Sequence, residues 1–251
     1  MSIFLTGERP VLTAMLRARS TEALIEEVKL ALDEGCEAFG FQIEALPPEY
    51  KKPSEFRKVI AAMGDKPAYV TNYRRCNNQK ELTDERLAEQ LLELLDCGAV
   101  LIDVFGDIFD PTPGEITWNE AAAERQTRLI EEIHRRGGEV LMSSHVLRFA
   151  PTDEVTAIAN AHKARGADIS KIVTNADNDA ELAENFSITM KLKRELGIPS
   201  LFLCNGSDWK RHRLYAPPLG SCMFLCVPGE PSANNNQPPL KKARAVLELL
   251  S

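Results

Sequence analysis

The chain has 251 residues, a formal net charge of −7, 44% hydrophobic residues and 27% charged residues. This length can bury a substantial core, and the composition is ordinary for a soluble globular protein. The negative charge argues against nucleic acid as a general partner, and no stretch approaches the roughly 20 apolar residues that cross a bilayer. Because the N-terminal apolar run is also too short for a secretory signal, we expect a cytoplasmic protein without nucleic-acid or membrane partners.

Strand-like apolar runs alternate with helical patterns along the whole chain. We predict strands at residues 11–16, 38–43, 68–72, 100–104, 140–144, 169–174, 200–204 and 222–227. Predicted helices cover residues 21–34, 54–63, 84–97, 118–136, 152–165, 179–196 and 241–250, and a poorly helical stretch follows the seventh strand. Eight such units are what a (β/α)8 barrel requires. We therefore predict an α/β fold, a (β/α)8 TIM barrel that forms a single domain over residues 1–251.

The alternative fold is an open, doubly wound sheet. Its dinucleotide-binding form needs glycines directly after the first strand, but the turn here is Arg17-Ala18-Arg19-Ser20. The chain also has no Walker-type glycine loop. Its six cysteines lack metal-ligand spacing, and Cys222 and Cys226 form only a lone pair on a predicted strand. We therefore expect no cofactor, no bound metal, and reduced, mostly buried thiols.

Lys171 is the most informative residue of the chain. In the sixth predicted strand, period-2 alternation places its side chain on the same face as Ile169 and Val173. A cation on an apolar face is costly unless it is paired or neutral, and burial lowers the pKa of a lysine. A neutral amine is a nucleophile that forms a Schiff base with a carbonyl substrate. The alternative is a structural lysine whose amine reaches water past the helices.

His145 ends the fifth predicted strand, one strand–helix–strand unit before Lys171. If the two strands are parallel neighbours, their axes lie about 4.8 Å apart. Active-site groups of a (β/α)8 barrel lie at the carboxyl ends of its strands. The pair could then act on one substrate, with the imidazole as the acid/base.

Two motifs around this pair resemble the type I 3-dehydroquinate dehydratases, which are Schiff-base barrel enzymes of the shikimate route. The stretch from Val140 to His145 is similar to the family's fifth-strand motif, in which a serine precedes the acid/base histidine by two residues. The stretch from Gly166 to Ile172 is similar to the sixth-strand pattern Gly-Ala-Asp-x-x-Lys. The resemblance implies a (β/α)8 barrel lyase, with an imine at Lys171 and acid/base catalysis by His145.

Near the end of the chain, the spacing of Gly206 and Arg213 resembles the family's run after the seventh strand. Ser232 resembles the lid serine, and Asn236 or Gln237 lies near the position of the lid glutamine. The resemblance implies that Arg213 binds a substrate carboxylate and that Ser232 and Gln237 close over the substrate. The implied partner is a small carboxylated hydroxy ketone. The sequence leaves the oligomeric state open, a homodimer included.

Two further acidic residues are candidates for the site. Asp103 ends the fourth predicted strand, where it could orient its neighbours, although an ion-pair or capping role is the alternative. Glu44 stands where the family has an aspartate on the second strand. It is a candidate for the acidic support of His145, since Asn77 occupies the position of the family's supporting glutamate.

Other departures concern the residues that would contact the substrate. Where the family's second strand has Glu-x-Arg, this chain has Gly40 and Gln42, and Tyr73 replaces an arginine on the third strand. The pair that would carry the chemistry is therefore present while the surrounding shell differs. This leaves the substrate open between 3-dehydroquinate and a relative with other substituents.

Three alternative functions remain at this stage. A class I aldolase would share the lysine but break a carbon–carbon bond, with weak candidates for a phosphate site at Gly206-Ser207 and Gly220-Ser221. A divalent-metal sugar isomerase would use Glu44, Asp103 and His145 as ligands. A barrel without catalysis would bind a carboxylated metabolite.

Overall fold

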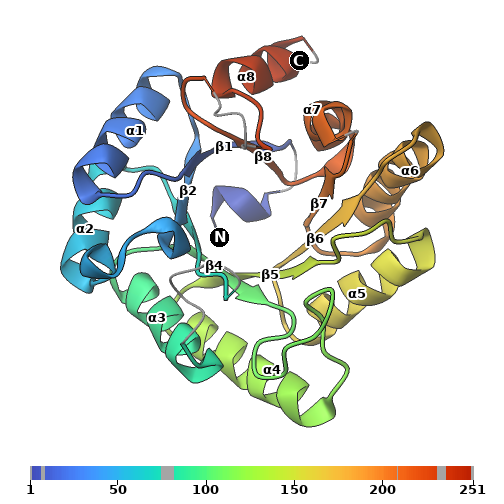
Figure 1. Ribbon diagram of the computed structural model, residues 1–251, viewed down its shortest axis with the longest axis horizontal. Coiled ribbons are helices and arrows are strands. Elements are labelled where there is room, and N and C mark those ends of the chain that lie inside the picture. Colours follow the sequence, from blue (N-terminus) through green and yellow to red (C-terminus); the bar gives the residue numbers. More distant parts are fainter. Residues whose placement is uncertain (1, 7–8, 75–81, 208, 231–235, 250–251) are drawn as a thin grey trace.

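Parallel strands form a ring of sheet with helices around its outside (Figure 1). The computed structural model describes residues 2–6, 9–74, 82–207, 209–230 and 236–249. Its strands are β1 Val11–Leu16, β2 Ala38–Gln42, β3 Ala68–Thr71, β4 Leu101–Phe105, β5 Glu139–His145, β6 Ile169–Asn175, β7 Ser200–Asn205 and β8 Met223–Cys226. Its α-helices are α1 Thr21–Asp33, α2 Pro53–Ala62, α3 Asp84–Asp96, α4 Glu120–Arg135, α5 Thr152–Ala164, α6 Asp179–Glu195, α7 Trp209–Gly220 and α8 Leu240–Glu248.

The strand order is that of a (β/α)8 barrel. Each strand from β1 to β6 pairs in parallel with its successor, and β8 pairs with β1. Between β8 and β7, the backbone N–H of Cys222 donates to the carbonyl of Ser200 at 2.8 Å. The predicted TIM barrel is thus confirmed. None of the helices within the described ranges is long and apolar enough to cross a membrane.

Two hydrophobic layers follow from the alternation of side chains along the strands. Inward-facing residues such as Leu101, Leu141 and Ile169 fill the barrel together with Phe4, which belongs to the short 3-10 helix Ile3–Leu5. Outward-facing residues pack against the helices. The inner layer closes the barrel below its carboxyl end, so polar groups at the strand ends face a cavity rather than a channel.

Four of the described α-helices begin at a residue whose side chain accepts a hydrogen bond from the first turn. Ser20, Thr83, Asn119 and Asn178 do so for α1, α3, α4 and α6, as N-cap residues prefer. Predicted and observed boundaries of these helices differ by only a few residues, because fraying ends are weakly determined.

The segment after β7 corrects the sequence-based prediction. We predicted a poorly helical stretch, but residues Trp209–Gly220 form α7 with Pro217 and Pro218 inside it. The two prolines lie in the last turn, where they interrupt few helical hydrogen bonds. His212 and Arg213 are buried on one side of α7. Tertiary packing therefore stabilises a helix that intrinsic propensity disfavours.

Candidate active site

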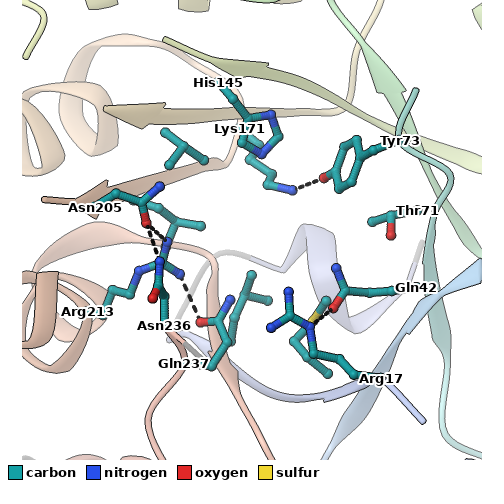
Figure 2. Close-up of a pocket in the computed structure, with 14 residues that line it drawn as sticks. Arg17, Gln42, Thr71, Tyr73, His145, Lys171, Asn205, Arg213, Asn236 and Gln237 are labelled. Atoms are coloured by element: carbon teal, nitrogen blue, oxygen red, sulfur yellow. Dashed lines mark hydrogen bonds between the residues drawn. The ribbon is translucent and has the colours of Figure 1, made fainter. Parts of the chain in front are cut away.

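A cavity of about 150 Å³ lies at the carboxyl ends of the barrel strands (Figure 2). Four of the predicted site residues line it: Lys171, His145, Arg213 and Gln237. The other lining residues are Met15, Arg17, Gln42, Thr71, Tyr73, Val173, Leu203, Asn205, Leu225 and Asn236. Lys171 and His145 thus share one cavity, as the parallel pairing of their strands predicted.

Lys171 reaches this cavity from within the barrel. In the register of β5 and β6 it pairs with Ser143, and its side chain is only 6% exposed. Its Nζ donates to the hydroxyl of Tyr69 at 2.9 Å and to the hydroxyl of Tyr73. It also lies 3.1 Å from Oδ2 of Asp103. The buried amine is therefore surrounded by polar partners, and these contacts offset the cost of removing it from water.

Asp103 is the anionic centre of this cluster. Its Oδ2 accepts hydrogen bonds from both tyrosine hydroxyls, that of Tyr73 at 2.6 Å, and its Oδ1 accepts from Ser143 Oγ at 2.5 Å. Burial alone would raise the pKa of this carboxyl, but the Lys171 ammonium and the three hydroxyl donors hold it below its usual value. Asp103 is thus kept ionised. For Tyr69, burial together with the nearby carboxylate raises the phenol pKa well above its ordinary value.

Glu115 supports His145. His145 Nδ1 lies 2.5 Å from Glu115 Oε2, and the imidazole packs edge-on against the ring of Tyr73. Glu115 belongs to the loop between β4 and α4, where it has a positive φ of 53°. The hydroxyl of Ser144 donates to its carbonyl at 2.6 Å. A carboxylate on Nδ1 fixes the ring orientation and leaves Nε2 as the atom available for acid/base chemistry.

Arg213 forms the opposite side of the cavity. Its Nε donates to the carbonyl of Cys204 at 2.8 Å, while Nη1 and Nη2 donate to Gln237 Oε1 and Asn205 Oδ1, both at 2.9 Å. Asn236 also donates to Asn205 Oδ1, at 3.1 Å. Burial lowers the pKa of the guanidinium to about 10. The group therefore stays cationic at neutral pH with neutral oxygens around it.

A third group of polar residues lies on the side of β1 to β3. Arg17 Nε donates to Gln42 Oε1 at 2.7 Å, and Gln42 Nε2 donates to Glu44 Oε1 at 3.3 Å. The Glu44 carboxylate accepts from Thr71 Oγ1 at 2.9 and 3.0 Å. Burial raises the pKa of Glu44, although the bond from Thr71 opposes that shift. The chain of contacts fixes the side-chain amide of Gln42 and, with it, the guanidinium of Arg17.

The comparison with known proteins agrees with this arrangement. The model of the type I 3-dehydroquinase family matches residues 12–251. The chain belongs to the type I 3-dehydroquinase family. A 3-dehydroquinate dehydratase from Shouchella clausii is 23% identical over 263 residues, which cover 98% of this chain and 93% of that protein.

Solved structures of type I 3-dehydroquinases have the same fold. The 3-dehydroquinate dehydratase from Geobacillus kaustophilus superposes with a TM-score of 0.81 at 16% identity, covering 98% of this chain and 93% of that one. The type I enzyme from Clostridium difficile gives a TM-score of 0.82 at 18% identity, with coverage of 97% and 94%. Identities this low show the shared fold, and the substrate needs its own argument.

Two predicted residues within the described ranges, Asp103 and Glu44, are not on the cavity wall. Asp103 lies one layer behind it, against Lys171. Glu44 does not line the cavity. Its predicted role as the support of His145 is wrong, because its carboxylate accepts from Thr71 and the carboxylate on His145 Nδ1 is that of Glu115. Ser232, the predicted lid serine, falls outside the described residues, as does Asn77.

Sequence analysis missed Glu115, Arg17 and the role of the two tyrosines. Glu115 lies in a loop without periodicity, so its position gave no signal. Tyr73 had been noted only as a departure from type I 3-dehydroquinases, although a phenol within reach of a strand-end lysine is itself a signal. At Gly40, the position that corresponds to an acid on the family's second strand, the Met15 side chain takes the space, since an added Cβ would lie 2.1 Å from its Sδ.

The alternative functions lose most of their structural basis. Ser207 donates its backbone N–H to Asp177 Oδ1 at 2.8 Å, and this carboxylate would repel a phosphate. Gly220-Ser221 precedes β8 and so lies at the amino end of the strands, away from the cavity. Within the described ranges, no three His, Cys, Asp or Glu side chains gather closely enough to hold a metal ion. The three ligands expected for an isomerase are therefore not assembled.

Gly206 gives a test of how the loop after β7 is built. Its φ is +85°, and an added Cβ would lie 2.6 Å from the carbonyl oxygen of Ala176. We expect Gly206→Ala to lower the free energy of unfolding by about 2 kcal/mol in urea denaturation. Gly64→Ala is the matched control, since Gly64 has a φ of +67° with open space around it. Equal losses in the two variants would show that the contact with Ala176 contributes nothing.

Proposed function

We propose that this chain is a Schiff-base lyase that removes water from a cyclic, carboxylated β-hydroxy ketone. The substrate is 3-dehydroquinate, giving 3-dehydroshikimate, or a close relative. The observation that carries the proposal is the buried amine of Lys171, which faces the same cavity as an imidazole supported by a carboxylate. Membership of the type I 3-dehydroquinase family supports the same reaction class.

The first step is attack of the Lys171 amine on the substrate ketone. The amine must lose a proton, and the hydroxyls of Tyr69 and Tyr73 and the Asp103 carboxylate all accept hydrogen bonds from it. The adduct then expels the ketone oxygen as water and becomes a protonated imine. Both hydrogens of this water come from the Lys171 ammonium. Tyr73 lines the cavity and donates to Asp103, so we assign it their transfer from nitrogen to oxygen. Asp103 balances the imine's positive charge.

The second step is removal of a proton from the carbon next to the imine. The protonated imine withdraws electrons, so a neutral His145 can accept this proton through Nε2 while Glu115 stabilises the imidazolium that forms. The resulting enamine expels the β-hydroxyl, which leaves as water with the proton from His145. Water then hydrolyses the product imine and frees Lys171.

The opposite wall would orient the substrate. Arg213 has a planar guanidinium suited to a carboxylate, and Asn205 and Gln237 hold it in place. This arrangement supports a substrate whose carboxylate lies across the cavity from its ketone. It also agrees with the side-chain placement in Figure 2, where Arg213 and Lys171 enter the cavity from different elements.

Imine trapping tests the proposal. The protein is mixed with 3-dehydroquinate and borohydride, and its peptides are analysed by mass spectrometry. We expect a reduced adduct on Lys171 in the wild type and in Lys29→Met, a control at an exposed lysine of α1. We expect none in Lys171→Met or Lys171→Arg. A folded wild type without an adduct, beside a reactive family enzyme, would rule out 3-dehydroquinate as the substrate.

Product analysis separates the lyase from a class I aldolase, which would form the same imine. The lyase keeps every carbon atom of the substrate in one product, whereas an aldolase releases two carbon fragments. Nuclear magnetic resonance of the reaction mixture distinguishes these outcomes. Two fragments would show that the same site residues catalyse carbon–carbon cleavage, as in an aldolase.

A further inference from the structure

Two guanidinium groups face the candidate active-site cavity, and among the described residues neither bonds to a carboxylate. Arg17 and Arg213 both line it, together with Lys171, and the lining residues include no aspartate or glutamate. Lys171 is paired with Asp103 behind the wall, but Arg213 is buried with neutral acceptors around it, which is costly until an anion binds. The charge of the described cavity wall therefore favours a ligand that is itself anionic.

Arg17 is solvent-exposed, but hydrogen bonds hold it in position at the mouth of the cavity. Glu27 Oε2 accepts from the backbone N–H groups of Arg17 at 2.9 Å and of Ala18 at 3.1 Å, which fixes the end of β1. The side chain donates from Nε to Gln42 Oε1 at 2.7 Å. Within the described part of the chain, its Nη1 and Nη2 atoms donate no hydrogen bond. Figure 2 shows the guanidinium turned toward the cavity.

Arg213 is buried among neutral acceptors, namely Cys204, Asn205 and Gln237. Burial lowers its pKa to about 10, and the positive charge of Arg17 acts in the same direction. Both guanidinium groups line the same cavity, so their positive charges repel each other. An anionic ligand would relieve both the desolvation of Arg213 and this mutual repulsion.

The two guanidiniums are held on different walls. Arg17 follows β1 and donates to Gln42 of β2. Arg213 belongs to α7 and donates to Asn205 of β7. In the ring of strands β8 lies between β1 and β7, so the two attachment points are two strand spacings apart, roughly 10 Å. Held on different walls of one cavity, the two guanidinium groups can bind two anionic groups of one ligand.

We infer that the cavity takes a hydroxy ketone with two anionic groups, one bound by Arg213 and the second by Arg17. This inference rests on the proposed function for the ketone, which reacts at Lys171. Because 3-dehydroquinate carries one carboxylate, the inference selects a relative of it that has a second anionic group. Arg17 is then the residue that determines specificity, because it selects the second anionic group.

Binding of two small hydroxy acids tests this inference. L-malate carries two carboxylates and L-lactate carries one, and neither has a ketone that could form an imine. Isothermal titration calorimetry should give a Kd for malate at least about 10-fold below that for lactate with the wild type. Arg17→Gln should remove this preference by weakening malate alone. Arg19→Gln, the same change at an exposed arginine that does not line the cavity, should retain it.

Two results would overturn the inference: equal affinity of the wild type for malate and lactate, or an unchanged malate affinity in Arg17→Gln. Thermal melting of the variants checks that they are folded. Because malate and lactate form no imine, the calorimetric test of the second anionic group is independent of the borohydride test of Lys171. Conversely, a 3-dehydroquinate adduct without a malate preference would leave the lyase proposal intact and remove the second anionic group.

Discussion

Replacing Lys171 with methionine is expected to reduce turnover of 3-dehydroquinate by about 10⁴-fold or more. The variant keeps the cavity and most of the side-chain volume but has no amine to form the imine. The loss should appear in kcat, measured by the ultraviolet absorbance of the conjugated ketone product. Lys171→Arg should be equally inactive, because it keeps a cation beside Asp103 without a nucleophilic amine.

The control Lys29→Met changes an exposed lysine and should keep wild-type kcat. Activity of Lys171→Met above about one hundredth of the wild type would mean that the reaction does not pass through an imine at this residue. Inactivity of Lys29→Met would point instead to a general loss of folding.

Lys171→Met should also change the free energy of unfolding, and the size of that change should depend on pH. In the wild type the pKa of Asp103 is depressed, so its contribution to stability is present above its ordinary pKa of about 4 and is lost as pH falls through the folded value. Lys171→Met removes the ammonium and leaves burial as the main influence, which raises the pKa of Asp103. The carboxylate then opposes folding at neutral pH, by about 3 kcal/mol.

The sign of the pH effect therefore reverses in this variant. We expect Lys171→Met to become more stable as pH is lowered from 7 to 5, roughly one to three pH units above the ordinary carboxyl pKa. Urea unfolding at both pH values measures this. Lys171→Met/Asp103→Asn should regain most of the stability at pH 7, because the amide carries no charge. If the double variant is no more stable than the single one, the ion pair is not what holds this cluster together.

The barrel and the position of its reactive pair were predictable because both depend on local periodicity. Alternation in β6 places Lys171 on the inner face, and helical spacing between the strands requires the parallel order that brings His145 beside it. These patterns are written in consecutive residues. The structure therefore reproduces them with shifts of only a few residues at the ends of elements.

The partners of this pair were not predictable, because they come from segments without periodicity. Glu115 reaches His145 from a loop whose conformation depends on Ser144 and on a positive φ. Glu44 lies at the right strand end, but a 3-10 turn at Ile43–Ala45 directs its carboxylate to Thr71. The chain thus leaves strand geometry at the end of β2, so the alternation of side chains along a strand does not predict where Glu44 points.

His145 and Glu115 should control the proton-transfer step and leave imine formation intact. We expect His145→Ala to lower kcat by about 10³-fold and Glu115→Gln by about 10²-fold, within the usual range for acid/base catalysis. Both variants should still give a borohydride adduct on Lys171, because its amine keeps its contacts with Tyr69, Tyr73 and Asp103. Glu124→Gln, at an exposed position of α4, is the control and should keep wild-type turnover.

The mass of the trapped adduct makes this prediction specific. In the wild type, borohydride should capture both the substrate imine and the product imine, and the second is lighter by one water. In His145→Ala the substrate imine should accumulate, so the heavier adduct should dominate. A lighter adduct in this variant would show that another group removes the proton. Loss of all adduct would instead show that His145 takes part in imine formation. It would contradict the assignment of His145 to the proton-transfer step alone.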